Sequence, residues 1–205
     1  MMYPLPQEDI INFLRTNIQV RSDATYGQGY RASVILTDGL ELPCVVFRNP
    51  ITIVDLAVRR FKEEQSGKSI FSKSSRLGYK EIVKGFVANG NCINYYDIAK
   101  VAKSDFAFSN STLKEIQGET KMGWTGFVAK MNDGKQFAFG TPFLFEFFDM
   151  PQAYSVNDIS EIINHYYLDK DNNLKSYQAN EVYENVDRNL IYRERPYFEC
   201  FIDNL

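Results

Sequence analysis

Cys92 and His165 are the residues whose types could support nucleophilic catalysis. Cys92 stands near the start of the run GNCINYYDIAKVAK, from Gly90, which has the spacing of an amphipathic helix. The amino end of a helix lowers the pKa of a thiol, and the resulting thiolate is a nucleophile. His165 is the single histidine of the chain, so a cysteine–histidine pair would have to use it. A cysteine hydrolase centred on Cys92 is therefore the alternative function, whereas a packed or helix-terminal His165 is the ordinary interpretation.

The segment around Cys92 resembles the nucleophile segment of transglutaminase-like cysteine proteases. In that family a Cys opens a helix, and a His and an Asp follow on successive strands. The sequence GW at 123–124 lies where the family has His-Trp, and FGTP at 139–142 lies where it has an Asp followed by Pro-Thr. Gly123 and Gly140 thus replace the two residues that would assist the thiol. The resemblance covers a minor part of the chain and implies an inactive relative of that family.

Motifs for calcium and phosphate each lack essential residues. Asp169, Asp171 and Asn173 have the spacing of an EF-hand loop, but Leu174 occupies the position that requires glycine. The run GKSIFSKSSR, from Gly67, lacks the first glycine of the Walker pattern and is interpreted as a solvated loop. The cysteines have no CxxC spacing that would indicate zinc. We therefore predict no metal site and no cofactor.

The charge of the chain is mildly acidic, with a formal net charge of −3 and a pI of about 5.3. This balance argues against a protein built chiefly to hold nucleic acid, because nucleic-acid-binding proteins carry basic surfaces. Residues 59–84 carry eight basic and three acidic side chains, and residues 146–203 carry twelve acidic and five basic ones, which predicts two solvated faces of opposite sign. No secretion signal opens the chain, and no apolar run approaches the length that crosses a bilayer. We expect a cytoplasmic protein without membrane contact.

Apolar residues spaced three and four apart predict helices over residues 6–16, 50–65 and 155–167. Segments 79–88 and 92–103 fit helix or strand, and we favour a helix for the second. The end of the chain, 192–202, alternates in patches and is expected to add a strand.

An internal echo links residues 29–50 and 123–142. Both segments begin with glycine and an aromatic residue, place an apolar strand before Asp-Gly, and close with F-x-x-P. An Asp-Gly pair between apolar strands favours a tight hairpin. We predict an α+β fold in which an antiparallel sheet contains two similar Asp-Gly β-hairpins and packs against helices. A single domain is expected over residues 1–205, and duplication of the hairpin units and chance similarity both remain open.

Aromatic residues beside glycines are the candidates for binding. Tyr26, Tyr30 and Trp124 could be exposed anchors, since interfaces favour rigid aromatic side chains. The alternative is that Tyr30 and Trp124 fill equivalent positions in the core. Because no catalytic or metal motif is complete, the sequence favours a non-enzymatic intracellular binding protein whose partner is another protein.

Overall fold

The computed structural model describes residues 2–23, 27–65, 91–121, 123–142, 145–177 and 187–205. The chain divides into two compact units: unit 1 comprises Met1–Lys103 and Phe198–Leu205, and unit 2 comprises Ser104–Tyr197. Unit 2 is therefore inserted between two segments of unit 1. The expected α+β class, with mostly antiparallel sheets, is confirmed. The expectation of one domain over the whole chain stays a prediction.

Unit 1 is built on a six-stranded sheet with the order β1-β2-β3-β12-β4, in which β5 also pairs with β2. The strands are β1 (Val20–Asp23), β2 (Gly27–Leu36), β3 (Glu41–Arg48), β4 (Cys92–Ile93), β5 (Ile98–Lys103) and β12 (Phe198–Phe201). The strand β12 runs parallel to both β3 and β4, whereas β1, β3 and β5 are antiparallel to β2. The last strand in the sequence, β12, thus lies inside this sheet between β3 and β4.

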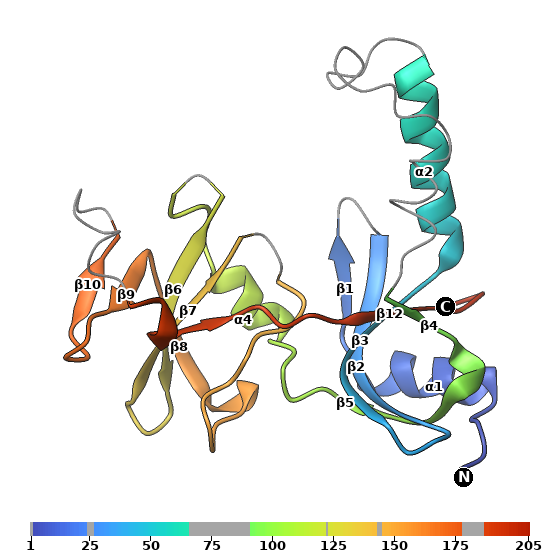
Figure 1. The fold of residues 1–205 in the computed structure, drawn as a ribbon, viewed down its shortest axis with the longest axis horizontal. Helices are drawn as coiled ribbons and strands as arrows, with labels where there is room; N and C mark the ends of the chain where they lie inside the picture. Colours follow the sequence, from blue (N-terminus) through green and yellow to red (C-terminus); the bar gives the residue numbers. More distant parts are fainter. Residues whose placement is uncertain (1, 24–26, 66–90, 122, 143–144, 178–186) are drawn as a thin grey trace. The chain divides into compact units, whose positions relative to one another are not determined.

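Helix α1 (Gln7–Asn17) packs on one face of this sheet, beside β2 and β5 (Figure 1). Residues buried in this core include Ile10, Ile11, Leu14, Ala32, Val34, Val45, Phe47, Ile98, Cys200 and Ile202. Helix α2 (Pro50–Gln65) buries Ile53, Leu56 and Ala57 on one side. The helices expected over residues 6–16 and 50–65 are therefore confirmed, because their apolar spacing matches the buried faces.

The helix favoured for residues 92–103 is wrong. This segment contains β4, a 3-10 turn η1 (Tyr95–Asp97) and β5. Ile98 and Val101 are both buried although they are three residues apart, since the register of β5 on β2 shifts by one residue between them. A β-bulge of this kind reproduces the spacing of a helix. Segment 79–88 lies outside the described residues.

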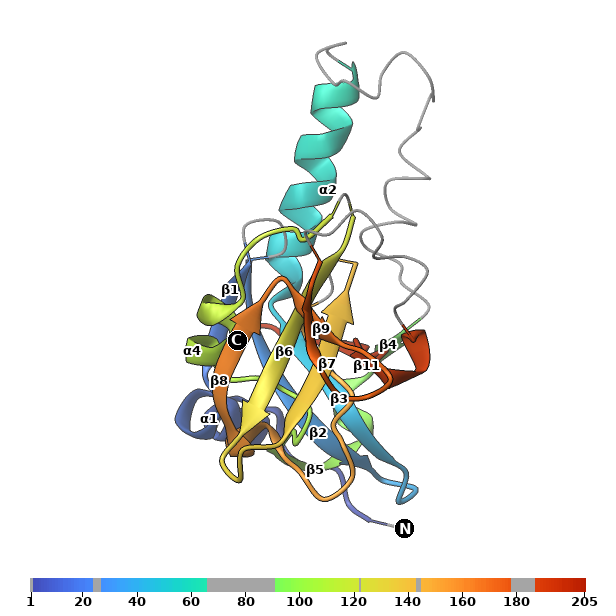
Figure 2. The same ribbon diagram turned by 90° about the vertical axis from the view of Figure 1, so that its left-hand side faces the viewer.

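Unit 2 contains a four-stranded sheet with the order β11-β7-β6-β8 and a two-stranded sheet of β9 and β10 (Figure 2). The strands are β6 (Thr125–Met131), β7 (Gln136–Thr141), β8 (Ile159–Asn164), β9 (Tyr166–Leu168), β10 (Leu174–Ser176) and β11 (Ile191–Arg193). Helix α4 (Asn110–Glu115) precedes β6 and is capped by the Ser109 hydroxyl, which accepts a hydrogen bond from the Thr112 N–H. Between them, β11 and β12 account for the strand expected near the end of the chain.

The core of unit 2 is a cluster of aromatic rings on one face of its sheet. The rings of Phe127 and Phe139, which are opposite each other on β6 and β7, stack with centroids 5.5 Å apart. Phe108 and Phe148 stack on the same cluster at 4.7 Å. The other face is apolar too, with Val128, Ala138 and Leu168 buried. Both faces of β6 and β7 are therefore covered, which fixes β7 rigidly at the centre of the unit.

The helix expected over residues 155–167 is also wrong, because the segment forms a 3-10 turn η2 (Val156–Asp158), then β8 and the start of β9. Ile159 pairs with Met131 and Ile162 with Ala129, so both isoleucines face the aromatic core. Ser160 is the extra residue of a bulge between these pairs. The bulge again places core residues three apart on a strand.

Candidate functional site

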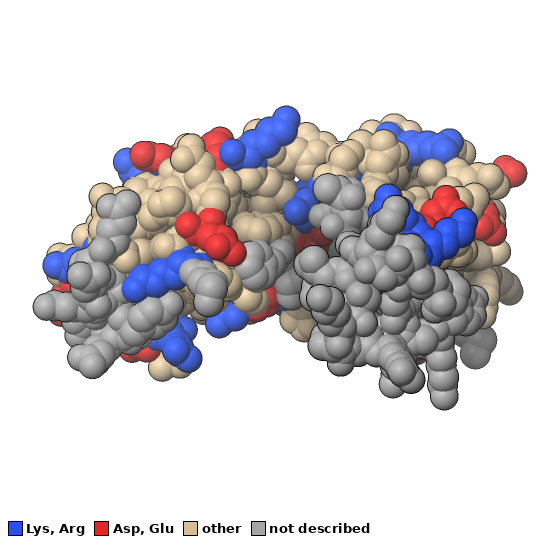
Figure 3. Space-filling model, turned by 90° about the horizontal axis from the view of Figure 1, so that it is seen from above, with Lys and Arg blue, Asp and Glu red and all other residues tan. Residues whose placement is uncertain are grey.

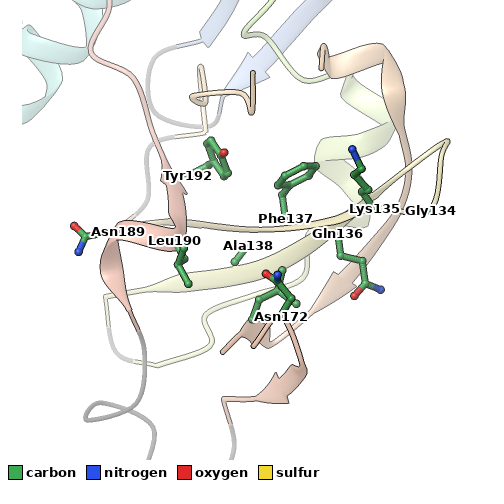
Figure 4. A pocket seen from close by; sticks show the side chains of 10 residues that line it. Gly134, Lys135, Gln136, Phe137, Ala138, Asn172, Asn189, Leu190 and Tyr192 are labelled. Atoms are coloured by element: carbon green, nitrogen blue, oxygen red, sulfur yellow. The ribbon is translucent and has the colours of Figure 1, made fainter. Parts of the chain in front are cut away.

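A pocket of about 450 Å³ lies in unit 2 along the edge of β7 (Figure 4). The hairpin end and β7 contribute Gly134, Lys135, Gln136, Phe137 and Ala138 to its wall. The β9–β10 region contributes Leu168 and Asn172, and the chain that enters β11 contributes Asn189, Leu190 and Tyr192. The pocket is thus assembled from three segments that are well separated in the sequence.

The pocket exists because β11 covers only part of the edge of β7. The paired residues run from Ile191 opposite Ala138 to Arg193 opposite Gly140. Immediately before β11, the 3-10 turn η3 (Arg188–Leu190) carries the chain off the line of the strand. In the part of the chain that the structure describes, no strand continues the sheet beside Gln136. An edge of this kind presents backbone groups that a further strand could use.

The direction of the backbone groups at this edge follows from the hairpin. The Met131 N–H donates to the Lys135 carbonyl at 2.8 Å, so these two residues form a hydrogen-bonded pair. Hydrogen-bonded and non-hydrogen-bonded pairs alternate along antiparallel strands. Gln136, which is opposite Lys130, is therefore in a non-hydrogen-bonded pair. Its N–H and C=O point away from β6 and toward the pocket.

The side chains around the pocket differ on the two sides of the sheet edge. Phe137 and Tyr192 lie on one side, with their rings in edge contact at 5.8 Å. Ala138 and Leu190 lie on the other side (Figure 4), and the buried Leu168 belongs to the same cluster as Ala138. Carboxamide groups from Gln136, Asn172 and Asn189 complete the lining. The pocket therefore combines apolar walls with amide groups that can donate and accept hydrogen bonds.

Lys135 is the charged residue of this lining, and its position is set by two neighbours outside the pocket. Its Nζ atom lies 3.9 Å from Asp133 Oδ2 and 5.5 Å from the centroid of the Tyr154 ring. The Tyr154 hydroxyl donates to Asp133 Oδ2 at 2.6 Å, and this hydrogen bond lowers the pKa of Asp133. A hydrogen bond with Tyr154 raises the pKa of Lys135. Both charges are therefore maintained at neutral pH, and Lys135 stays at the rim.

The Trp124 side chain packs on the sheet and does not project from an open loop. Its ring lies over Gly126 and Gly140, which are opposite each other on β6 and β7, and a Cβ atom at Gly140 would collide with the ring. Arg193 is the last residue of β11, and its guanidinium lies 4.7 Å from the centroid of the Trp124 ring. Arg193 also forms a forked ion pair with Glu194, with an Nη2–Oε1 distance of 3.0 Å. The glycine pair thus forms a slot for Trp124, and Arg193 borders it.

The other two candidate aromatic residues lie in unit 1. Tyr30 is half-buried on β2, packs against the core of that unit and borders a pocket of about 410 Å³ together with Ile51 and Leu205. Tyr26 lies outside the described residues. The role of these residues and of Trp124 in binding stays a prediction.

Cys92 and His165 belong to different units. Cys92 is exposed and begins β4, where it pairs with Glu199 of β12, so the helix that would lower its pKa is not there. His165 lies between β8 and β9 with a φ of 63°, and its Nε2 atom is 2.8 Å from the Gln117 carbonyl oxygen. Burial raises the pKa of the neighbouring Cys200 thiol to about 12, with a further contribution from Cys92.

The acidic turn after β9 is held by its own backbone. The Asp169 Oδ1 atom accepts hydrogen bonds from the N–H groups of Asp171 and Asn173, each at 2.9 Å.

Among the described residues, no group of three or more His, Cys, Asp or Glu side chains could hold a metal ion. No described helix is long and apolar enough to cross a membrane. Figure 3 shows basic and acidic side chains interspersed on the face that it draws.

A scan against protein-family models found no match, and searches among curated proteins and among solved structures found none either. The β7-edge pocket is therefore interpreted from its own geometry.

Proposed function

We propose that this chain is a non-enzymatic binding protein that takes an extended peptide segment of a partner protein into the β7-edge pocket. The observation that carries this proposal is the outward direction of the Gln136 N–H and C=O groups beside an open, partly apolar pocket. A peptide that pairs with Gln136 would add a short strand along β7, in line with β11. Recognition of this type obtains affinity from backbone hydrogen bonds and specificity from pockets for alternate side chains.

The two-sided lining suits such a ligand. Successive side chains of an extended peptide point to opposite faces of a sheet. One side chain would meet Phe137 and Tyr192, and the next would meet the apolar wall formed by Leu168 and Leu190. A volume of about 450 Å³ lies within the range of pockets that bind small ligands, and it accommodates a few residues of a peptide.

The lining favours binding over catalysis. General acid–base or nucleophilic chemistry needs a carboxylate, imidazole, thiol or activated amine beside the substrate. Among the residues that the structure describes around the pocket, none is Asp, Glu, His or Cys. Tyr154 raises the pKa of Lys135, which favours its charged, non-nucleophilic form.

A proline at position 136 tests the proposal directly. Because the Gln136 N–H does not bond to β6, Gln136→Pro removes the outward donor while the ladder of the hairpin is retained. Gln136→Ala is the matched control, since it keeps the N–H and shortens the side chain. Random peptides displayed on phage would be selected on the wild-type protein, and their affinities measured by fluorescence anisotropy.

We expect the selected peptides to bind the wild-type and Gln136→Ala proteins with similar affinity. Loss of a backbone hydrogen bond and a steric block at the edge should weaken binding to Gln136→Pro at least about tenfold. Peptides that bind Gln136→Pro as tightly as the wild type would contradict the proposal, as would a selection that enriches no peptide.

The two units support a further proposal about how the chain is built: we infer that unit 2 is a second copy of the unit 1 module, inserted into it. In sequence order, β2, β3, β5 and β12 correspond to β6, β7, β8 and β11. The corresponding strands lie in the same spatial order, β5-β2-β3-β12 in unit 1 and β8-β6-β7-β11 in unit 2. In each unit the fourth strand is parallel to its neighbour and the other pairs are antiparallel. A helix precedes the first strand in both.

Local details agree with this inference. In unit 1 the Gly39 N–H donates to Leu36 O, and in unit 2 the Gly134 N–H donates to Met131 O, both at 2.9 Å. Both glycines have positive φ, 94° and 88°. Each turn also donates a backbone N–H to the last residue of a 3-10 turn, from Thr37 to Asp97 in unit 1, at 2.8 Å. The corresponding bond of unit 2 joins Asn132 and Asp158, also at 2.8 Å.

The equivalence of the two hairpins is best counted from their turns. Counted in this way, Val34 corresponds to Ala129, and both face the core of their unit. The Gly-aromatic similarity of the two sequences instead pairs Gly29 with Gly123, which differs from this count by one residue. Tyr30 and Trp124 are therefore at different positions in the two modules, and the similarity of the Gly-aromatic pairs does not come from a shared packing role.

A further inference from the structure

We propose that the β7-edge pocket receives the carboxyl terminus of its peptide ligand, with the terminal carboxylate placed at Lys135. This inference rests on the proposed function and makes it more specific. It is carried by the charge of the lining and by the direction in which the pocket is closed.

The hairpin closes the pocket at the end where β7 begins. Gln136 is the first residue of β7, and Lys135 and Gly134 form the wall just before it. The opposite end of the pocket lies beside Leu190 and the start of β11. A peptide antiparallel to β7 would run from Leu190 toward Lys135. The peptide residue opposite Gln136 would form the hydrogen-bonded pair, and the next residue would end about 3.4 Å further on, beside Lys135.

The charged group at that end is a donor. Among the described residues that line the pocket, Lys135 is the charged one, a cation, and its side chain is 67% exposed. The ion pair with Asp133 orients Lys135 from outside the pocket and is solvent-exposed, so it is weak and leaves ammonium protons available. Asn172 contributes a carboxamide to the same lining, and Asn189 contributes one at the end beside Leu190 (Figure 4). A carboxylate is the terminal group of a peptide that the Lys135 cation can bind.

The amino terminus of a peptide is the less suitable occupant. It would place a second cation beside Lys135, and like charges at close range repel. An internal segment, in turn, would have to continue past Gly134 and the hairpin turn, where the edge ends. The chemistry at Lys135 therefore favours a chain that ends there.

The test compares two forms of each selected peptide, one with a free carboxylate and one with a carboxamide terminus. The peptides would come from a display format that leaves their carboxyl ends free, and binding would be measured by isothermal titration calorimetry. We expect amidation to weaken binding to the wild-type protein at least about tenfold, in the range of a charge-assisted hydrogen bond. Lys135→Ala should weaken binding of the free acid to a similar degree and leave the amide unchanged, while Lys135→Arg retains the preference.

The outcomes separate this inference from the proposed function. Equal binding of acid and amide, lost in Gln136→Pro, would overturn the carboxylate inference and leave edge binding intact. An acid preference that persists in Lys135→Ala would overturn the role of Lys135. Failure of both forms to bind would overturn the proposed function itself.

Discussion

The glycine slot beneath Trp124 allows a sharp test of whether this residue packs or binds. Gly140→Ala places a methyl group where the Trp124 ring lies, and the ring cannot simply withdraw because Arg193 borders it. Overfilling a packed site typically costs about 1–3 kcal/mol. For a chain of this size, about 2 kcal/mol corresponds to a fall in Tm of about 4–8 °C.

The sign of the effect should reverse when the ring is removed. In a Trp124→Ala background the slot is empty, so the methyl group of Gly140→Ala meets no ring. A glycine in a strand is costly to order, and replacing it by alanine where the backbone permits gains about 0.4–1 kcal/mol. Gly140→Ala should therefore be neutral or stabilising in that background.

Differential scanning calorimetry of the four proteins of this double-mutant cycle gives the coupling energy. Trp124→Ala alone should lower the Tm, because a half-buried ring is lost, but it should leave peptide binding below the Tm unchanged, since Trp124 does not line the pocket. A similar loss of stability from Gly140→Ala in both backgrounds would refute the slot. Loss of peptide binding by Trp124→Ala at full stability would instead identify Trp124 as a binding residue.

Three further predictions follow from the cysteines and from the inserted unit. Cys92 is exposed, while Cys44 and Cys200 are buried, so mass spectrometry of the native protein treated with iodoacetamide should show one alkylated thiol, and labelling of all three would contradict this difference in burial. Because the folded state raises the pKa of Cys200 from 9.0 to about 12, its stabilisation is complete below pH 9 and is lost as the pH rises through that interval. Cys200→Ala should therefore flatten the alkaline fall in Tm, and an unchanged slope would contradict this assignment. Finally, Ser104–Tyr197 should fold when expressed alone, because its sheet and aromatic core close within these residues; a disordered NMR spectrum would argue against an inserted module.

The helices that the sequence predicted correctly are those whose apolar spacing is uninterrupted. Residues 6–16 and 50–65 keep that spacing over several turns, and no strand-like alternation competes with it. Residues 92–103 and 155–167 carry the same local signal for another reason. A bulge in β5 and a bulge at Ser160 in β8 each put two core residues three apart. Since a bulge is defined by the partner strand, a single sequence cannot distinguish it from a helical turn.

The glycines were the least informative residues when considered without their partners. Glycine beside an aromatic residue is typical of a loop, which made Trp124 a candidate for an exposed anchor. In the folded unit, Gly126 and Gly140 are opposite each other, and the space left by their missing side chains is filled by Trp124 over Gly140 and by Tyr177 and Trp124 over Gly126. The pairing of two glycines across strands is a tertiary feature, and the sequence distance between them gave no reason to expect it.

The pocket illustrates why a search for chemical motifs did not find the candidate site. Cys92 and His165 stood out because their side chains could react, whereas the group that matters most at the β7 edge belongs to the backbone of Gln136. Any residue except proline supplies the same N–H and C=O at that position. Whether these groups are open to a ligand depends on η3, which carries the chain off the line of β11 about fifty residues later in the sequence. A site of this kind depends on the path of the chain far more than on the types of its residues. It is recognised in the structure because, among the described strands, β11 begins opposite Ala138 and leaves Gln136 of β7 unpaired on that side.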